Sequence, residues 1–135
     1  NLAMAFETEG LRLDPERVGR GVRAVLESED RGFYLLAERG GVVLGQLMLT
    51  YEWSDWRDGV FWWIQSVYVP PEARRSGVYR ALYTRLLDEA RGSGDVCGIR
   101  LYVHHDNRIA MATYEALGMD VAAYRIFEVD FVLER

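Results

Sequence analysis

The spacing of apolar residues along this chain switches between a helical and a strand period, and the switches predict the order of its elements. Residues 15–27 repeat apolar side chains at Val18, Val22 and Val25, as on one face of a helix, and an Asp-Pro pair before them is typical of a helix start. Residues 1–9 are also expected to be helical. Strands are predicted at residues 32–38, 42–51, 61–69, 99–104 and 124–133, with a shorter one at residues 119–122. Two further helices are predicted at residues 77–91 and 107–117.

The most informative segment joins a buried strand to an amphipathic helix through a basic turn. Pro70 and Pro71 end the apolar run of residues 61–69, and residues 74–77 read Arg-Arg-Ser-Gly. The first amides of a helix have no partner inside the helix and carry partial positive charge. Two guanidinium groups and a glycine at that point suit a phosphate, although a basic helix start on a solvated surface has the same composition.

Other phosphate-binding loops fit this turn less well. A P-loop requires Gly-x-x-x-x-Gly-Lys-Ser/Thr, which the chain lacks. A dinucleotide fingerprint requires three glycines after a strand, and this turn has one. The sequence therefore favours a different class of phosphate site.

Composition narrows the class of protein. A chain of 135 residues with 50% hydrophobic and 27% charged residues is expected to form a single domain, residues 1–135. The net charge of −5 argues against a nucleic-acid partner, and no apolar run suggests a membrane span. The lone Cys97 excludes an internal disulfide and suits a reducing, cytoplasmic location.

Two motifs resemble those of the GNAT superfamily of N-acetyltransferases. Arg74-x-x-Gly77-x-Tyr79 resembles the Gln/Arg-x-x-Gly-x-Gly/Ala pattern of motif A, with a tyrosine in place of the second small residue. Leu101-Tyr-Val103 followed by Asn107-x-x-Ala110-x-x-x-Tyr114-x-x-x-Gly118-Met119 looks like motif B. The resemblance covers most of residues 32–135.

The resemblance implies an α/β (α+β) fold with a mixed, mostly antiparallel central sheet and helices on both faces. The strands before and after the central helix would run parallel and splay apart, leaving a gap for the pantetheine arm of the cofactor. Family members open with a strand that precedes the first helix. This chain has no such strand and no initiating Met, so its natural first residues are expected to be missing.

The resemblance also implies acetyl transfer from acetyl-CoA to an amine, with no metal. The diphosphate would rest on the turn and helix start, and the pantetheine would pair with the end of the preceding strand. The expected cofactor-binding residues are Val67, Tyr68, Val69, Arg74, Arg75, Ser76, Gly77, Val78, Tyr79, Arg80 and Asn107.

Tyr114 is the expected general acid, because the pKa of a tyrosine, about 10, lies close enough to that of a thiol, about 8.5, for proton donation. The motifs give a weaker indication of the general base that would accept the proton of the amine. Gln65 and Tyr102 stand where many family members have a glutamate, so His104, expected on the same strand face as Tyr102, is the candidate. The alternative is a water chain organised by Gln65, Ser66 and carboxylates such as Glu7 or Glu52. His104 and His105 are expected on opposite strand faces and not as a metal pair.

Acidic and aromatic side chains are the expected contacts of a cationic acceptor. The candidates are Glu7, Glu52, Trp56, Gln65 and Tyr102, although helix-surface acids and loop tryptophans commonly face solvent. Two alternatives to N-acetyl transfer stay open: a CoA-binding module without catalysis, and a transferase for another acyl group. A homodimer is a reasonable expectation.

Overall fold

Four strands form one mixed sheet across residues 1–133, the part of the chain that this computed structural model describes. The elements follow in the order α1 (Leu2–Glu9), α2 (Pro15–Leu26), β1 (Phe33–Arg39), β2 (Val42–Ser54), β3 (Gly59–Tyr68), α3 (Val78–Gly92), β4 (Val96–Leu101) and α4 (Arg108–Ala116). Short 3-10 turns occupy Asp55–Arg57 and Pro71–Ala73.

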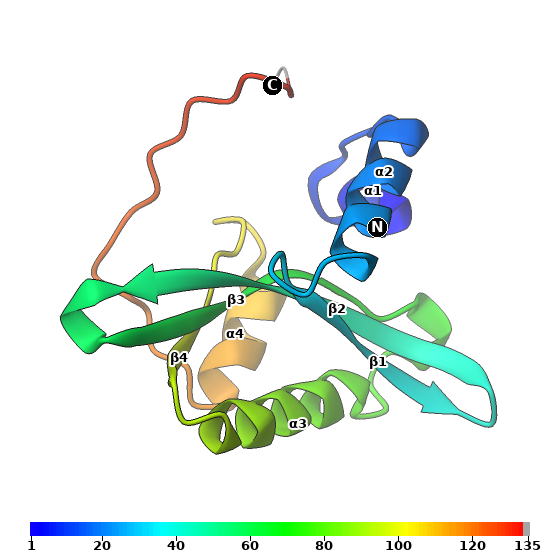
Figure 1. Ribbon diagram of the computed structural model, residues 1–135. Coiled ribbons are helices and arrows are strands. Elements are labelled where there is room, and N and C mark those ends of the chain that lie inside the picture. Colours follow the sequence, from blue (N-terminus) through cyan, green and yellow to red (C-terminus); the bar gives the residue numbers. More distant parts are fainter. Residues whose placement is uncertain (134–135) are drawn as a thin grey trace.

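The sheet combines antiparallel and parallel pairs in the order β1-β2-β3-β4. β1 with β2 and β2 with β3 are antiparallel, whereas β3 and β4 are parallel and flank α3 in the chain. In Figure 1, α3 and α4 lie on one side of the sheet and α1 and α2 on the other. The expected α/β architecture, with helices on both faces and a parallel pair around the central helix, is confirmed.

The core lies between α3 and the sheet. Leu86 of α3 and Leu47 and Leu49 of β2 are fully buried. A Cβ added to Gly45 of β2 would lie 2.7 Å from Cγ1 of Val78, so only glycine lets the first turn of α3 pack this closely on the sheet. This contact fixes the start of α3, where the predicted phosphate turn lies.

The predicted helix caps are present. The Asp14 side chain accepts a hydrogen bond from the Glu16 amide at the start of α2. The Asn107 side chain accepts one from the Ala110 amide at 3.1 Å at the start of α4, and Gly118 follows that helix with a φ of 90°. Within the described chain, none of the helices is both long and apolar enough to cross a membrane.

Three predicted strands differ from the structure. No strand forms at residues 119–122 or 124–133, where every residue from 121 to 133 is exposed and no neighbouring strand supplies a partner. The strand predicted at residues 99–104 is instead Val96–Leu101, because pairing with β3 determines its register. β2 also extends beyond the predicted end at residue 51 to Ser54.

Candidate active site between β3 and β4

A β-bulge separates the two parallel strands. The β3–β4 pairing ends at Ile64 and Leu101. At the same point Leu49 pairs with Ile64 but Met48 pairs with Ser66, so Gln65 is an extra residue on β3. A bulge bends its strand and increases the local twist. β3 therefore continues to Tyr68 paired with β2 alone, and its edge on the β4 side is open.

A cavity of about 130 Å³ fills this divergence. β3 contributes Gln65 and Val67 to its wall, and Tyr114 enters from α4. The other lining residues come from α1, from β3, from the end of β4 and from the segment that follows it: Met4, Thr8, Glu9, Ile64, Ser66, Leu101, Tyr102, Val103, His104 and Asn107. Seven residues predicted from the sequence thus share one cavity: Gln65, Ser66, Val67, Tyr102, His104, Asn107 and Tyr114.

The turn before α3 exposes backbone donors. Arg75 and Gly77 both have positive φ, 60° and 80°. The first bond of the helix runs from the Ala81 amide to the Gly77 carbonyl at 3.0 Å. The three preceding amides, of Val78, Tyr79 and Arg80, meet no acceptor among the described residues. An anion would be their natural acceptor, since the helix dipole adds positive potential there.

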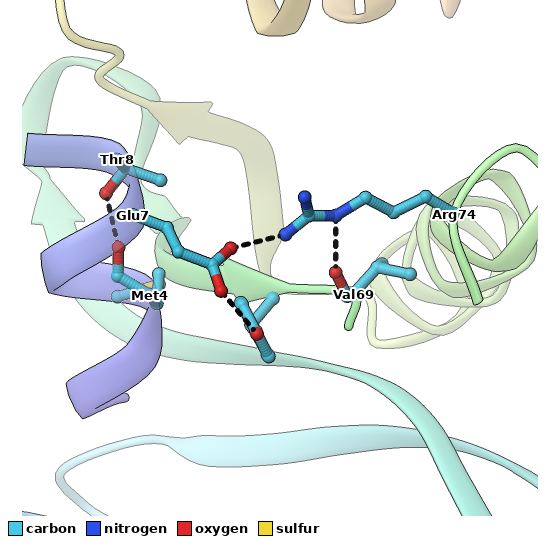
Figure 2. A network of polar contacts seen from close by, with 6 residues as sticks. Met4, Glu7, Thr8, Val69 and Arg74 are labelled. Atoms are coloured by element: carbon cyan, nitrogen blue, oxygen red, sulfur yellow. Dashed lines mark hydrogen bonds and ion pairs between the residues drawn. The ribbon is translucent and has the colours of Figure 1, made fainter. Parts of the chain in front are cut away.

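Arg74 is engaged by α1 and by its own turn, as Figure 2 shows. Its guanidinium forms an ion pair with Glu7 at 2.6 Å and donates to the Val69 carbonyl at 2.8 Å. The Tyr68 hydroxyl donates to the second Glu7 oxygen at 3.0 Å. The hydrogen bonds from Arg74 first, and from Tyr68 second, hold the pKa of Glu7 below its ordinary value. Glu7, predicted as an acceptor contact, thus contacts two predicted cofactor residues.

Tyr79 packs inside the protein. Its ring stacks on Tyr83 at 6.1 Å and meets the edge of the Tyr114 ring at 5.7 Å. Its hydroxyl is buried without a hydrogen-bond partner among the described residues. Burial raises the pKa of both Tyr79 and Tyr114. The large residue at this motif position therefore supports the candidate acid instead of crowding the turn.

The expectation that His104 and His105 point to opposite faces of a strand is wrong. β4 ends at Leu101, so both residues lie in the following turn and their rings stack at 4.5 Å. The His104 Nδ1 accepts a hydrogen bond from the Asp106 amide at 3.3 Å. The two imidazoles and the Asp106 carboxylate form an exposed group of three potential metal ligands whose atoms lie within 4.8 Å of one another. Only His104 of the three also lines the cavity.

Three predicted acceptor residues lie outside the cavity wall: Glu7, Glu52 and Trp56. Glu52 is paired with Arg100 at 2.7 Å, and that guanidinium lies 3.6 Å from the centre of the Phe61 ring. Trp56 is 84% exposed in the turn between β2 and β3. Conversely, sequence reasoning missed Met4 and Thr8, which line the cavity. Their i, i+4 spacing on a short helix was the available signal.

Comparison with known proteins agrees with this geometry. Residues 4–119 match the acetyltransferase (GNAT) family. The chain belongs to the GNAT family. It is 30% identical to mycothiol acetyltransferase of Kocuria rhizophila over 83% of this chain and 46% of that protein. It is 36% identical to L-amino acid N-acyltransferase MnaT of Escherichia coli over 66% of this chain and 51% of that protein. This GNAT chain therefore spans about half the length of the curated relatives it matches.

A solved structure resembles the chain throughout its length. The crystal structure of a possible acetyltransferase from Clostridium difficile 630 superposes with a TM-score of 0.91 and 41% identity. The match covers 98% of this chain and 88% of that one, so it includes most of the residues that follow α4. The chain therefore has the fold of that protein over nearly its whole length.

Proposed function

We propose that this protein transfers an acetyl group from acetyl-CoA to a primary amine of a small molecule or peptide. The observation that carries the proposal is the cavity between β3 and β4. Tyr114 lines it, and the strand that forms one wall leads directly into the turn with free amides. This order of elements suits a site that binds a thioester at one end and a diphosphate at the other.

The cofactor contacts follow from the open backbone groups. The amides of Val78, Tyr79 and Arg80 would receive the diphosphate, and the exposed Arg75 and Arg80 side chains add positive charge. Pantetheine carries amides, so it would pair with the open edge of β3 at residues 66–68 as an added strand. A backbone N–H of Val67 or Tyr68 would then polarise the acetyl carbonyl.

Acetyl-CoA supplies an acetyl thioester, whose C–S bond breaks as the amine nitrogen bonds to the carbonyl carbon. The Tyr114 hydroxyl would donate the proton that the departing sulfur takes up. Because burial raises the pKa of Tyr114, the hydroxyl stays protonated through neutral pH and is available as a donor. General acid catalysis of this kind typically contributes about 10²–10⁴-fold in rate.

The amine must also lose a proton. An alkylammonium has a pKa of about 10.4, so roughly one molecule in a thousand is nucleophilic at neutral pH. His104 and Glu9 are the cavity residues that could take this proton. His104 is our candidate, acting through Nδ1 after its bond to the Asp106 amide opens or through Nε2 after a change of tautomer. His104→Gln should lower turnover and remove one ionisation from the pH–rate profile, whereas Glu9→Gln should leave that ionisation in place.

The test is CoA thiol release from acetyl-CoA across a panel of amino acids, amino sugars and peptide amines. Tyr114→Phe should lower kcat at least about 10²-fold with CoA affinity unchanged. Tyr34→Phe is the matched control, because Tyr34 lies on β1 and its hydroxyl contacts Asn1. Turnover with a different acyl-CoA alone would indicate a transferase for another acyl group. CoA binding without any turnover would indicate a CoA-binding module without catalysis. Absence of CoA binding would overturn all three.

A further inference from the structure

Both histidines of the chain lie next to each other, in the turn between β4 and α4. Together with the carboxylate that follows them they form the histidine–aspartate group of this turn: His104, His105 and Asp106. Their side chains are 43%, 83% and 79% exposed, so a dissolved ion can reach all three. The proposed acetyl transfer uses His104 alone, and the chemistry of the other two side chains is left unassigned.

The turn holds these three side chains together before any ligand arrives. The Asn107 amide donates to the His104 carbonyl at 2.8 Å, and the Arg108 amide donates to the Asp106 carbonyl at 2.9 Å. The Asn107 side chain also caps α4, which fixes the turn against that helix. The two imidazole rings stack with their centres 4.5 Å apart. The backbone therefore has little conformational freedom to lose when the three side chains close on one ligand.

Each ring has a nitrogen close to the same carboxylate oxygen. Nε2 of His105 lies 3.3 Å from Oδ2 of Asp106, and Nδ1 of His104 lies 3.9 Å from that oxygen. Zn²⁺ binds histidine nitrogen and carboxylate oxygen at about 2.0–2.2 Å, so two ligand atoms of one tetrahedral ion lie about 3.4 Å apart. The first pair already has this separation, and the second exceeds it by about 0.5 Å. Rotation of exposed side chains can remove that difference.

The ligand set selects a class of ion. Two imidazole nitrogens and one carboxylate oxygen are typical of Zn²⁺ and its neighbours among the late transition metals. Ca²⁺ and Mg²⁺ instead require a shell of oxygen atoms. Three protein ligands fill three positions of a tetrahedral Zn²⁺ site and leave the fourth to water. The net charge of −5 on the chain also favours a cation.

We propose that His104, His105 and Asp106 bind one Zn²⁺ ion beside the cavity between β3 and β4. On binding, Nδ1 of His104 exchanges its hydrogen bond from the Asp106 amide for a bond to the ion. The ion takes no part in acetyl transfer. Because His104 also lines the cavity, a ring held by Zn²⁺ can no longer turn toward the acceptor amine and take its proton. Zinc should therefore inhibit transfer, a consequence that rests on the proposed function, whereas the site itself does not.

Calorimetric titration with ZnCl₂ tests the site on protein that has been treated with EDTA and desalted. The wild-type chain should bind one ion. His105→Asn and Asp106→Asn should each weaken binding at least about 10-fold, since loss of even an outer partner of a zinc ligand costs about 10–100-fold in affinity. Asp88→Asn, which neutralises an exposed carboxylate on α3, and Cys97→Ser, which removes the free thiol, are the matched controls and should bind as the wild type does.

Nitrogen-15 NMR of the imidazole rings identifies the ligands directly. The chain has two histidines, so the ring signals belong to His104 and His105 alone. One equivalent of Zn²⁺ should shift the signals of both rings. A shift at one ring only, no shift at all, or binding that His105→Asn and Asp106→Asn leave unchanged would overturn the site.

The activity of the full chain tests the consequence. Acetylated product is measured by mass spectrometry, because Zn²⁺ binds the thiol that the reaction releases. Saturating Zn²⁺ should lower wild-type turnover at least about 10-fold, since general base catalysis contributes about 10²–10⁴-fold, and EDTA should restore it. Asp106→Asn, compared with its own rate in EDTA, should lose most of this inhibition.

The outcomes separate the site from the proposed function. Zinc binding at both rings in a chain that transfers no acetyl group would support the site and overturn acetyl transfer alone. Inhibition that is unchanged in Asp106→Asn would place the inhibitory ion elsewhere. Binding at both rings without any inhibition would overturn the link between this site and His104 as the base.

Discussion

The two faces of the sheet are built differently. On one face, α3 buries Val78, Leu82, Tyr83, Leu86 and Ala90. On the other, α1 buries only Ala5, and every residue of α2 remains at least partly exposed to solvent. The α3 face is a packed core, whereas the α1–α2 face is held in part by polar contacts, such as the hydrogen bond from Gln46 to Asn1 at 2.7 Å.

This difference matches the two tasks of the proposed enzyme. The start of α3 would bind a diphosphate that is the same in every reaction, so a rigid core beneath it is an advantage. Met4, Thr8 and Glu9 of α1 line the part of the cavity that an acceptor would reach. A loosely packed helix can adjust there to acceptors of different shape. The ion pair between Glu7 and Arg74 joins the two faces.

The largest expected contrast is in stability. Leu86→Ala removes a fully buried side chain of α3 and should lower the free energy of unfolding by about 2–5 kcal/mol. Val22→Ala on α2 removes a half-buried side chain and should cost under about 1 kcal/mol. Urea unfolding of the two variants measures both values. Equal decreases in the free energy of unfolding would contradict the difference in packing between the two faces.

A smaller effect, of opposite sign, is expected at Tyr79. Its buried hydroxyl has no partner among the described residues, and an unsatisfied buried polar group costs about 1–3 kcal/mol. Tyr79→Phe should therefore raise the free energy of unfolding by about 1 kcal/mol. Tyr83→Phe, one turn along the same helix, is the control and should be close to neutral. A destabilised Tyr79→Phe protein would mean that the hydroxyl has a partner in solution.

The smallest effect on global stability is expected at the junction of the two faces. Glu7→Gln removes the ion pair with Arg74. Amide hydrogen exchange should then accelerate in α1 and stay unchanged in α3, because only α1 depends on that contact for its position. Glu9→Gln is the matched control on the same helix. Unchanged exchange in α1 would show that the Glu7 contact contributes nothing to its position.

The same contact predicts a pH dependence. The hydrogen bonds from Arg74 and Tyr68 lower the pKa of Glu7 from its ordinary value of 4.5. A carboxyl whose pKa is lower when folded than when unfolded stabilises the folded state above the unfolded pKa. This contribution is lost as the pH falls below about 4.5 and through the folded pKa. Acid should therefore loosen α1 in the wild-type protein, and Glu7→Gln should remove that part of the pH response.

Much of the fold was predictable because its signals are local. The cap of α2, the two prolines after β3 and the capping Asn107 each determine a boundary through neighbouring residues. The strand prediction for the segment after α4 was wrong because its outcome depends on a distant part of the chain. Its residues have strand character, but a strand also requires pairing with a neighbouring strand, and the four-stranded sheet of the described residues does not include this segment.

The site was predictable to the extent that motif spacing fixes it. The structure brings Tyr114, Asn107 and His104 to one cavity, although His104 lies in the turn after β4 and not on the strand face expected of it. The engagement of Arg74 by Glu7 was not predictable, because it joins residues 67 positions apart through side chains alone. The stacking of His104 on His105 was missed because β4 ends earlier than its apolar run suggests.

The most direct test of the central claim is amide hydrogen exchange with and without CoA. The amides of Val78, Tyr79 and Arg80 have no acceptor among the described residues, so they should exchange rapidly in the free protein and become protected when CoA binds. Pantetheine without the diphosphate should protect residues 66–68 of β3 and leave those three amides unchanged. CoA binding that leaves all three amides unprotected would contradict the assignment of α3 as the diphosphate site.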